Sequence, residues 1–332
     1  MNNVKILDCT LRDGGYVNDW EFGLESIKQL ITNLSYSNID FVECGFLKNS
    51  LYDNNKSIFS NISQLKDLLP KTNSTKFALM INYGEFSIDD VDEKFSKDLM
   101  LRIAFKKKDL PKVLDFSYKL KEKGFNIFLN PMYINMYSDM ELLDLISEIN
   151  KIKPFAFSIV DTIGAMKEKD ILSSFYLIDN NLLKEIVLCF HSHNNLQLSF
   201  SNAQSLMRVC TKRELIIDST VFGIGRGAGN IQTEQLIKYI NDNSEEKKYN
   251  IIPILKSIDE QINPIYIKTP WGYSVPYYLA AVNNCHPNYA KYLSNKKFLS
   301  VEKMDVILGS IPNDKKNIYD EELIKKSFNS FR

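Results

Sequence analysis

The sequence predicts a (β/α)₈ barrel followed by an α-helical C-terminal subdomain. Short apolar runs alternate eight times with longer amphipathic segments over roughly the first 240 residues, the length expected of such a barrel. No convincing strand run occurs after about residue 243. A doubly wound open sheet is the competing fold, but the glycine-rich phosphate turn usual after its first strand is absent. We therefore expect a catalytic barrel over residues 1–243 and a helical subdomain over residues 244–332.

The predicted strands are short apolar runs bounded by polar residues. They are Val4–Asp8, Phe41–Gly45, Lys76–Ile81, Leu99–Phe105, Phe125–Pro131, Phe155–Val160, Ile186–His191 and Leu215–Ser219. The segments between them place apolar residues three or four positions apart, which predicts helices. These helices are Leu24–Ser35, Ile58–Leu69, Leu110–Lys123, Met140–Ile149, Ile171–Leu183 and Leu198–Cys210. Residues 82–98 are short and acidic for a helix, so a brief helix or a loop is expected there.

The predicted subdomain follows a polar linker at Asn243–Asn250. Its helix-like stretches are Ile252–Gln261, Pro276–Asn283, Val301–Leu308 and Glu321–Phe328. The aromatic cluster Trp271–Tyr278 should form an apolar seam against the barrel, with a wall of the active site as the alternative. A homo-oligomer could form through these helices.

Composition and charge exclude several classes of function. The 41 basic and 41 acidic residues give a formal net charge of zero, so no global field attracts nucleic acid or acidic lipid. Five cysteines without CxxC spacing argue against a disulfide framework and fit small core residues in a reducing compartment. The N-terminus lacks a signal-peptide pattern, and no window approaches the ~20 apolar residues of a membrane span. We expect a soluble cytoplasmic protein.

Two stretches carry side chains suited to a divalent metal. Arg12 and Asp13 follow the first predicted strand, and His191 and His193 follow the seventh, sharing a face because they are two residues apart. One carboxylate and two imidazoles make a facial metal site with open positions. An arginine next to an aspartate is more often a surface salt bridge, but two of the three histidines lie in the second stretch. Their common place at strand ends favours the metal site.

Further polar residues end other predicted strands at the same edge of the barrel: Glu43, Asn130, Asp161, Thr162 and Asp218. The last strand leads into a glycine-rich loop, Gly223–Asn230, that opens a helix. Free N–H groups of such a loop could hold a carboxylate or phosphate. The spacing of a phosphate loop, with lysine followed by serine or threonine, is absent, so the loop alone is weak evidence.

Five motifs together resemble one known superfamily. They are Thr10-Leu-Arg-Asp-Gly14, the Glu43 strand, Asp161-Thr-Ile-Gly164, His191-Ser-His193 with Asn195, and Gly227-Ala-Gly-Asn230. In order and over roughly residues 4 to 240, they resemble the metal-dependent pyruvate aldolase and acyl-CoA lyase superfamily, built on a TIM barrel. It holds 4-hydroxy-2-oxovalerate aldolases, 3-hydroxy-3-methylglutaryl-CoA lyases, and isopropylmalate and homocitrate synthases. The stretch after the histidines looks most like the aldolase branch.

The resemblance implies a metal site, a reaction and residue roles. Mn²⁺ or Mg²⁺ would be bound by Asp13, His191 and His193. Asn230 would be a further metal ligand or would support the metal site. Arg12 would stabilise the oxygen of the enolate formed when the C–C bond of a 4-hydroxy-2-oxo acid breaks. The substrates would be pyruvate, or another 2-oxo acid, and an aldehyde. We expect Glu43 to act with the catalytic residues and the substrate to contact Asp161, Thr162 and Asn130.

The chain departs from the aldolase branch at one position. That branch carries a histidine three residues after the motif's aspartate, where it acts as base on the 4-hydroxyl, and this chain has Tyr16 there. A phenol is a weaker base than imidazole at neutral pH. Tyr16 therefore acts as a catalytic group through a perturbed environment, or it packs and contacts substrate while another group or a water takes the proton.

The region beyond the barrel leaves further alternatives open. In the aldolase branch it docks a partner dehydrogenase, and no matching interface can be identified in this sequence. His286 should cap or pack within the helical subdomain, with a substrate contact as the alternative. A Claisen-type reaction on an acyl-CoA and a barrel that binds ligands without turnover are the competing functions.

Overall fold

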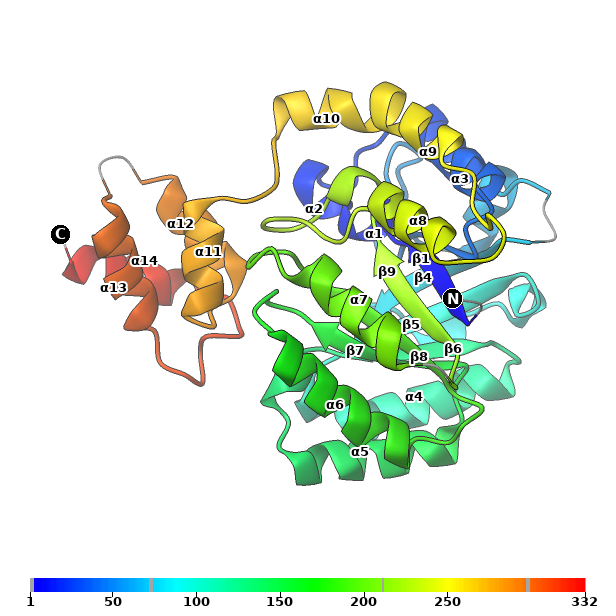
Figure 1. The fold of residues 1–332 in the computed structure, drawn as a ribbon, viewed down its shortest axis with the longest axis horizontal. Helices are drawn as coiled ribbons and strands as arrows, with labels where there is room; N and C mark the ends of the chain where they lie inside the picture. Colours follow the sequence, from blue (N-terminus) through cyan, green and yellow to red (C-terminus); the bar gives the residue numbers. More distant parts are fainter. Residues whose placement is uncertain (1–2, 72–73, 211, 297–298, 332) are drawn as a thin grey trace.

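Eight parallel strands form a closed barrel, which confirms the predicted fold (Figure 1). The structure is a computed structural model and describes residues 3–71, 74–210, 212–296 and 299–331. Strand β1 pairs with both β2 and β9, and this closes the cylinder. The barrel strands are β1 (Val4–Asp8), β2 (Phe41–Leu47), β4 (Lys76–Asn82), β5 (Leu99–Phe105), β6 (Ile127–Pro131), β7 (Ala156–Asp161), β8 (Val187–Ser192) and β9 (Leu215–Ser219).

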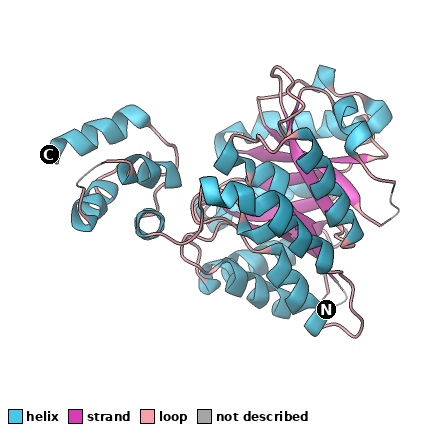
Figure 2. Cartoon of the chain, turned by 90° about the horizontal axis from the view of Figure 1, so that it is seen from above, coloured by secondary structure: helices cyan, strands magenta, loops and turns pink. Residues whose placement is uncertain are grey.

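Helices surround these strands on the outside of the barrel (Figure 2). The longer ones bury one apolar stripe against the strands, as their spacing of apolar residues predicts. Two single-turn helices, α1 and α2, directly follow β1. The helices of the barrel are α1 (Thr10–Asp13), α2 (Gly15–Asn18), α3 (Leu24–Tyr36), α4 (Leu110–Glu122), α5 (Asp139–Ile152), α6 (Glu168–Asn181), α7 (Ser199–Val209) and α8 (Thr233–Asp242).

The second and third repeats differ from the others. The predicted helix Ile58–Leu69 is wrong at its start, because β3 (Ile58–Phe59) pairs in parallel with the end of β2 and only Ile62–Leu68 is helical, as a 3₁₀ helix. Asn61 and Gln64 cap that helix reciprocally. In the third repeat, the expected brief helix is confirmed as two single 3₁₀ turns, Ile88–Asp90 and Glu93–Phe95.

Two apolar layers hold the barrel together. A large cluster fills the space between strands and helices, and a smaller one, which includes Leu7, Phe41 and Phe128, fills the barrel interior. The five cysteines are free and buried, in agreement with their predicted place in the core. Among the described residues, none of the helices combines the length and the apolar character needed to cross a membrane.

The C-terminal residues form further helices. Helix α9 packs on α3, and Tyr249, Ile254 and Ile262 belong to the barrel's apolar cluster. Helices α11 to α14 have an apolar cluster of their own and stand beside the barrel (Figure 1). The predicted domain boundary at residue 243 stays a prediction. The elements are α9 (Ile252–Ser257), a π-helical turn (Ile258–Ile262), α10 (Asn263–Lys268), α11 (Val275–Val282), α12 (Pro287–Ser294), α13 (Val301–Gly309) and α14 (Glu321–Ser330).

The aromatic segment before α11 contacts the barrel through Trp271. Its indole N–H donates to the carbonyl oxygen of Phe222 at 3.1 Å, and the two rings meet edge to face. Trp271 also packs against the barrel's apolar cluster. The predicted seam is thus confirmed at Trp271 only, because Tyr273 and Tyr278 are exposed and Tyr277 packs against the apolar cluster of the C-terminal helices.

Candidate active site

The first strand presents Arg12 and Asp13 through the short helix α1. Gly14, which ends this helix, has an ordinary helical φ of −60°. A Cβ at Gly14 would lie 2.4 Å from the Thr10 carbonyl oxygen and 2.8 Å from Ile224 Cγ2. Glycine is therefore required because α1 packs closely against the loop that follows β9, and this packing fixes Asp13 at the barrel mouth.

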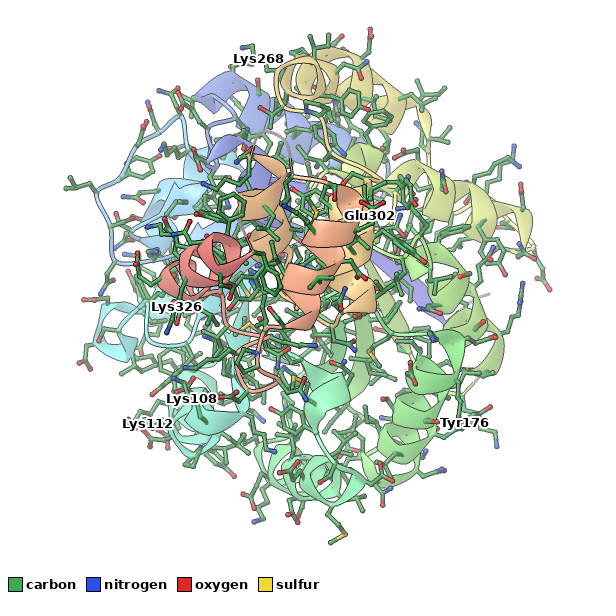
Figure 3. All side chains as sticks on the ribbon, turned by 90° about the vertical axis from the view of Figure 1, so that its left-hand side faces the viewer. Lys108, Lys112, Tyr176, Lys268, Glu302 and Lys326 are labelled. Atoms are coloured by element: carbon green, nitrogen blue, oxygen red, sulfur yellow. The ribbon has the colours of Figure 1, made fainter. Side chains whose placement is uncertain are left out.

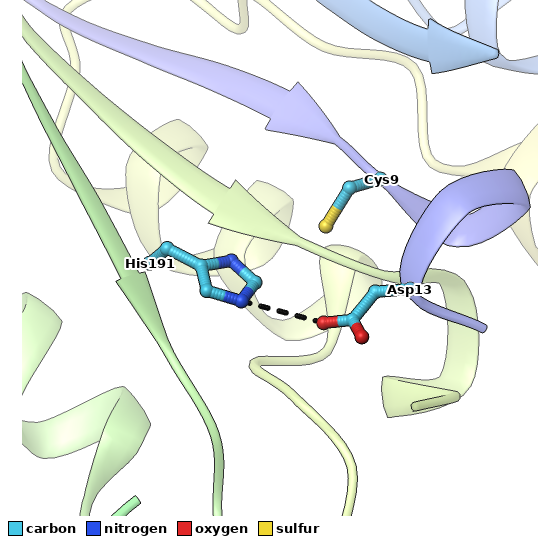
Figure 4. Close-up of side chains that lie close together, drawn as sticks. All are labelled: Cys9, Asp13 and His191. Atoms are coloured by element: carbon cyan, nitrogen blue, oxygen red, sulfur yellow. Dashed lines mark ion pairs between the residues drawn. The ribbon is translucent and has the colours of Figure 1, made fainter. Parts of the chain in front are cut away.

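The three predicted metal ligands converge at this mouth. Asp13 Oδ2 lies 3.3 Å from His191 Nε2 and 3.9 Å from His193 Nε2, and all three side chains are buried. The two imidazole rings are nearly perpendicular, with centroids 5.2 Å apart. Cys9 Sγ belongs to the same cluster, since the ligand atoms of Cys9, Asp13 and His191 lie within 4.8 Å of one another (Figure 4).

The carboxylate of Asp13 fits a cation. Burial raises its pKa, but the charge of Arg12 and the two histidines outweigh burial and hold the pKa well below its usual range. Neither of its buried oxygens accepts a hydrogen bond within the described part of the chain. An ionised, buried carboxylate without hydrogen bonds is costly, so a divalent ion at this place would remove the penalty.

The histidines are oriented as metal-binding imidazoles usually are. His191 presents Nε2 to Asp13, while its Nδ1 lies 3.1 Å from Asp218 Oδ2 on β9. Such a carboxylate behind a ligating histidine fixes the ring and its tautomer. Burial lowers the pKa of His193 to about 3, so this imidazole is neutral and can donate its lone pair to a metal.

A buried ion-pair chain supports the cluster from inside the barrel. Glu43 Oε2 accepts from Arg12 Nε at 2.7 Å and lies 3.3 Å from Arg102 Nη1. Arg102 Nη2 in turn donates to Asp218 Oδ2 at 2.6 Å. Arg12, Glu43, Arg102, Asp218 and His191 thus form one continuous chain. Two buried guanidinium groups are tolerable here because each faces a carboxylate.

A cavity of about 300 Å³ opens beside the cluster. Arg12, Asp13 and both histidines line it, together with the predicted residues Tyr16, Asn130 and Thr162. Asn130 Oδ1 accepts from Arg102 at 3.2 Å, so the ion-pair chain also orients this amide. The volume is at the lower end of the range for small-molecule sites.

Four predicted residues lie outside the cavity lining: Glu43, Asp161, Asp218 and Asn230. The Asp161 carboxylate accepts hydrogen bonds from the backbone N–H groups of Gly164, Ala165 and Met166 and from the Ser192 hydroxyl. It therefore shapes the loop that presents Thr162. Asn230 donates to the Ile224 carbonyl oxygen, and its own Oδ1 is buried without a hydrogen bond.

A family model matches residues 91–259, which is half of the chain, and its description is HMGL-like. This chain belongs to the HMGL-like family. The match confirms the superfamily that the motifs indicated.

The HMGL-like chain is similar to several curated proteins. A 4-hydroxy-2-oxovalerate aldolase of Geobacillus genomosp. 3 is 23% identical over 268 residues, which cover 79% of this chain and 77% of that protein. An oxaloacetate decarboxylase of Mycobacterium tuberculosis is 20% identical over 234 residues, which cover 70% of this chain and 68% of that protein.

Solved structures show the same fold. The N-terminal domain of a candidate aldolase from Bacteroides vulgatus superposes with a TM-score of 0.78 at 27% identity, covering 90% of this chain and 99% of that one. A hydroxymethylglutaryl-CoA lyase from Pseudomonas aeruginosa superposes with a TM-score of 0.63 at 14% identity, covering 79% and 93%.

Some cavity residues of this HMGL-like chain were not expected from its sequence. Arg102 is one, although a single arginine within the apolar run Leu99–Phe105 was a usable signal. Others lie on loops after β5, β6 and β9 and on the segment between α13 and α14: Lys106, Tyr133, Arg226, Asn317, Ile318 and Tyr319. The hydroxyl of Tyr133 donates to the Asn317 carbonyl oxygen at 2.6 Å, which ties the C-terminal segment to the barrel mouth.

Several N–H groups of the loop Gly223–Asn230 are engaged within the protein, whereas no hydrogen bond to a described residue engages those of Gly225, Arg226 and Gly227. Asn195 Oδ1 accepts from Ala228 N, Arg226 O accepts from Gly229 N, and Gly223 O accepts from Asn230 N. These bonds fix the loop, with Gly227 and Gly229 at φ of 69° and 85°. The side chain of Arg226, rather than the backbone, points to the cavity.

His286 has the capping role expected from the sequence, and its contact with substrate stays a prediction. Its side chain caps α12 by accepting from Asn288 N at 3.1 Å, and it also lines the cavity.

Proposed function

We propose that this protein is a divalent-metal-dependent carbon–carbon lyase. It forms or cleaves a 4-hydroxy-2-oxo acid from pyruvate, or another 2-oxo acid, and an aldehyde. One observation carries the proposal. The ionised Asp13 carboxylate accepts no hydrogen bond from a described residue and faces His191 and His193, and Arg12 lies beside it on the cavity wall. The aldolase names of similar proteins support the same reaction.

Asp13, His191 and His193 would hold Mn²⁺ or Mg²⁺, with Asn230 Oδ1 as a further donor or a support. Cys9 is near, but burial raises the pKa of its thiol well above the usual value. A protonated thiol is a poor ligand for these oxygen-preferring ions. When bound, the metal supplies a Lewis acid that polarises the keto group of a 2-oxo acid.

Arg12 is placed to stabilise the oxygen that gains negative charge during C–C cleavage. Its Nε is held by Glu43 at 2.7 Å, and its Nη1 lies 3.5 Å from Asp13 Oδ1. Glu43 and Asp13 keep it charged, and the remaining N–H donors can face the cavity. Glu43 therefore positions Arg12, and Arg102 positions Glu43 in turn.

Tyr16 would exchange the proton of the 4-hydroxyl. It lines the cavity, and its ring is fixed edge to face against Trp20, with centroids 4.8 Å apart. The Arg226 guanidinium lies 5.1 Å from the centroid of the same ring. Thr162 and Asn130 would contact the substrate, and Asp161 would act by holding Thr162.

Exchange of the pyruvate methyl protons with deuterated water tests the proposal. Protein stripped of metal and refilled with Mn²⁺ should catalyse this exchange, observed by NMR, and the stripped protein should not. Absence of exchange in the refilled protein would overturn the proposal. Stabilisation by CoA thioesters but not by pyruvate in a thermal melt would favour the acyl-CoA reaction instead.

Location in the cytoplasm, assembly through the C-terminal helices and docking of a dehydrogenase stay predictions.

A further inference from the structure

The cavity contains four cationic side chains, and they fall into two pairs. Arg12 and Arg102, on the barrel strands and α1, each contact carboxylates. Lys106 follows β5 and Arg226 follows β9, and both line the cavity. Neither Lys106 nor Arg226 forms an ion pair with any described residue, and Arg226 Nε is buried without a hydrogen bond. Lys106 and Arg226 are called the outer pair below. Their positive charge is not neutralised by any described carboxylate.

His286 adds a donor to the same region. Its Nδ1 accepts the N–H of Asn288 at the start of α12, so in the neutral imidazole Nε2 carries the hydrogen. Burial, followed by the charge of Arg226, lowers the pKa of His286 to about 2, which keeps it neutral. Nε2 lies 3.3 Å from Arg226 Nη1, which can only donate. Two donors therefore meet without an acceptor between them.

Arg226 is held in place rather than free to fold back. Its guanidinium lies over the Tyr16 ring, and its loop is anchored by the bond from Ala228 N to Asn195. A Cβ on Gly227 would lie 2.6 Å from Asn195 Oδ1, so the loop packs closely at this point. A positioned guanidinium with unused donors is suited to bind a planar or tetrahedral anion.

The carboxylate of the 2-oxo acid does not account for this region. Around the metal site, Asp13, Glu43 and Asp218 face Arg12 and Arg102, which leaves one net negative charge. A divalent ion and one substrate carboxylate then bring the inner site to neutrality. The positive charges of Lys106 and Arg226 are still not neutralised. A second negative charge on the substrate would neutralise part of them.

We propose that the acceptor aldehyde carries an anionic group, a phosphate ester or a carboxylate, at the end remote from its carbonyl. Arg226 and His286 donate to that group at the side of the cavity formed by the C-terminal subdomain, and Lys106 adds charge. This inference rests on the proposed function and names its substrate class.

Matched pairs of aldehydes test the proposal in the condensation direction with pyruvate and Mn²⁺. D-Glyceraldehyde 3-phosphate is compared with D-glyceraldehyde, and succinic semialdehyde with butanal. The anionic member of at least one pair should have a kcat/KM higher by roughly 10- to 100-fold, the size of one hydrogen bond to a charged group. A preference for glyceraldehyde 3-phosphate indicates a phosphate ester, and a preference for succinic semialdehyde indicates a carboxylate. Equal rates within both pairs would overturn the proposal.

Two variants assign the preference to residues. Arg226→Gln should reduce the ratio of anionic to neutral kcat/KM by at least about 10-fold, and Lys106→Gln should reduce it less. Lys108→Gln is the control, because Lys108 is exposed (labelled in Figure 3) and is not among the residues that line the cavity. A ratio unaffected by Arg226→Gln would contradict the assignment.

A binding measurement separates this inference from the proposed function. Inorganic phosphate and succinate are titrated into metal-free protein, followed by thermal melting. At least one should raise the Tm of the wild type and of Lys108→Gln but not of Arg226→Gln. If pyruvate exchange fails while this pattern appears, the reaction is wrong and the anion site stands. If exchange succeeds and neither anion binds, the anion site is wrong.

Discussion

The inner and outer parts of the cavity are built in opposite ways. At the barrel mouth, Arg12, Glu43, Arg102 and Asp218 form an unbroken chain of buried ion pairs, and the chain ends at the imidazole of His191, 3.1 Å from Asp218. Toward the C-terminal helices, Lys106 and Arg226 have no carboxylate partner among the described residues.

This difference indicates what each part does. Groups that are fully paired within the protein are held rigidly, and they can position a metal and stabilise the same charge in every turnover. Groups that lack a protein partner gain one only from the substrate. The inner part therefore fits the bond chemistry and the outer part the choice of acceptor.

The largest effect should follow removal of the inner carboxylate. Asp13→Asn should lose bound Mn²⁺, measured by elemental analysis after dialysis, and lower kcat/KM on the order of 10⁴-fold, about 5 kcal/mol. Asp144→Asn, an exposed change on α5, is the control and should keep both. Metal content equal to the wild type would disprove the ligand role of Asp13.

Breaking the ion-pair chain should destabilise the fold. Arg102→Met leaves Glu43 and Asp218 without this partner and should lower the free energy of unfolding by about 3–5 kcal/mol in urea titrations. Arg226→Gln in the outer part should cost about 1 kcal/mol or less. Equal losses in the two variants would remove the distinction between the inner and outer parts.

Arg12→Lys should separate metal binding from catalysis. An ammonium group keeps the charge but cannot hold Glu43 and face the substrate oxygen together. The variant should retain metal while kcat falls roughly 10²- to 10³-fold. Full activity would show that Arg12 contributes only a point charge.

Stability should depend on pH through Asp8, which anchors β1 beneath the site by accepting from Thr233 and Thr10. Burial raises the pKa of Asp8 from 3.8 to about 6, so the folded state binds this proton more tightly than the unfolded state. The free energy of unfolding, relative to Asp8→Asn, should be constant below about pH 4 and fall by about 3 kcal/mol up to pH 6. A pH-independent difference between the two proteins would contradict this.

A smaller effect on catalysis than that of Asp13→Asn is expected for Tyr16→Phe. The ring keeps its contact with Trp20, while the hydroxyl that would carry the proton is lost. C–C cleavage should slow about 10²-fold, and pyruvate methyl exchange, which does not involve the 4-hydroxyl, should change less. If both rates fall together, Tyr16 acts on the 2-oxo acid instead.

Much of the barrel could be predicted from the sequence because each repeat carries its own pattern. The strands Val4–Asp8, Leu99–Phe105 and Leu215–Ser219 have the predicted bounds, since polar residues flank each apolar run. Ile58–Leu69 was misread because Ile58, Ile62 and Leu65 keep helical spacing across a short strand and a 3₁₀ helix.

The candidate site was predictable only in its inner part. Asp13, His191 and His193 gather because parallel barrel strands end at one edge, a rule that needs no coordinates. Arg226 and His286 meet because the C-terminal helices dock on the barrel mouth, and no local pattern encodes that docking. The direction of Arg102 likewise depends on closure of the cylinder.

The tie between Tyr133 and Asn317 joins the barrel to helices that have an apolar cluster of their own. Substitutions within those helices can therefore accumulate without strain on the barrel. Over evolutionary time, such a unit can vary the outer lining of the cavity while the inner residues of the barrel stay unchanged.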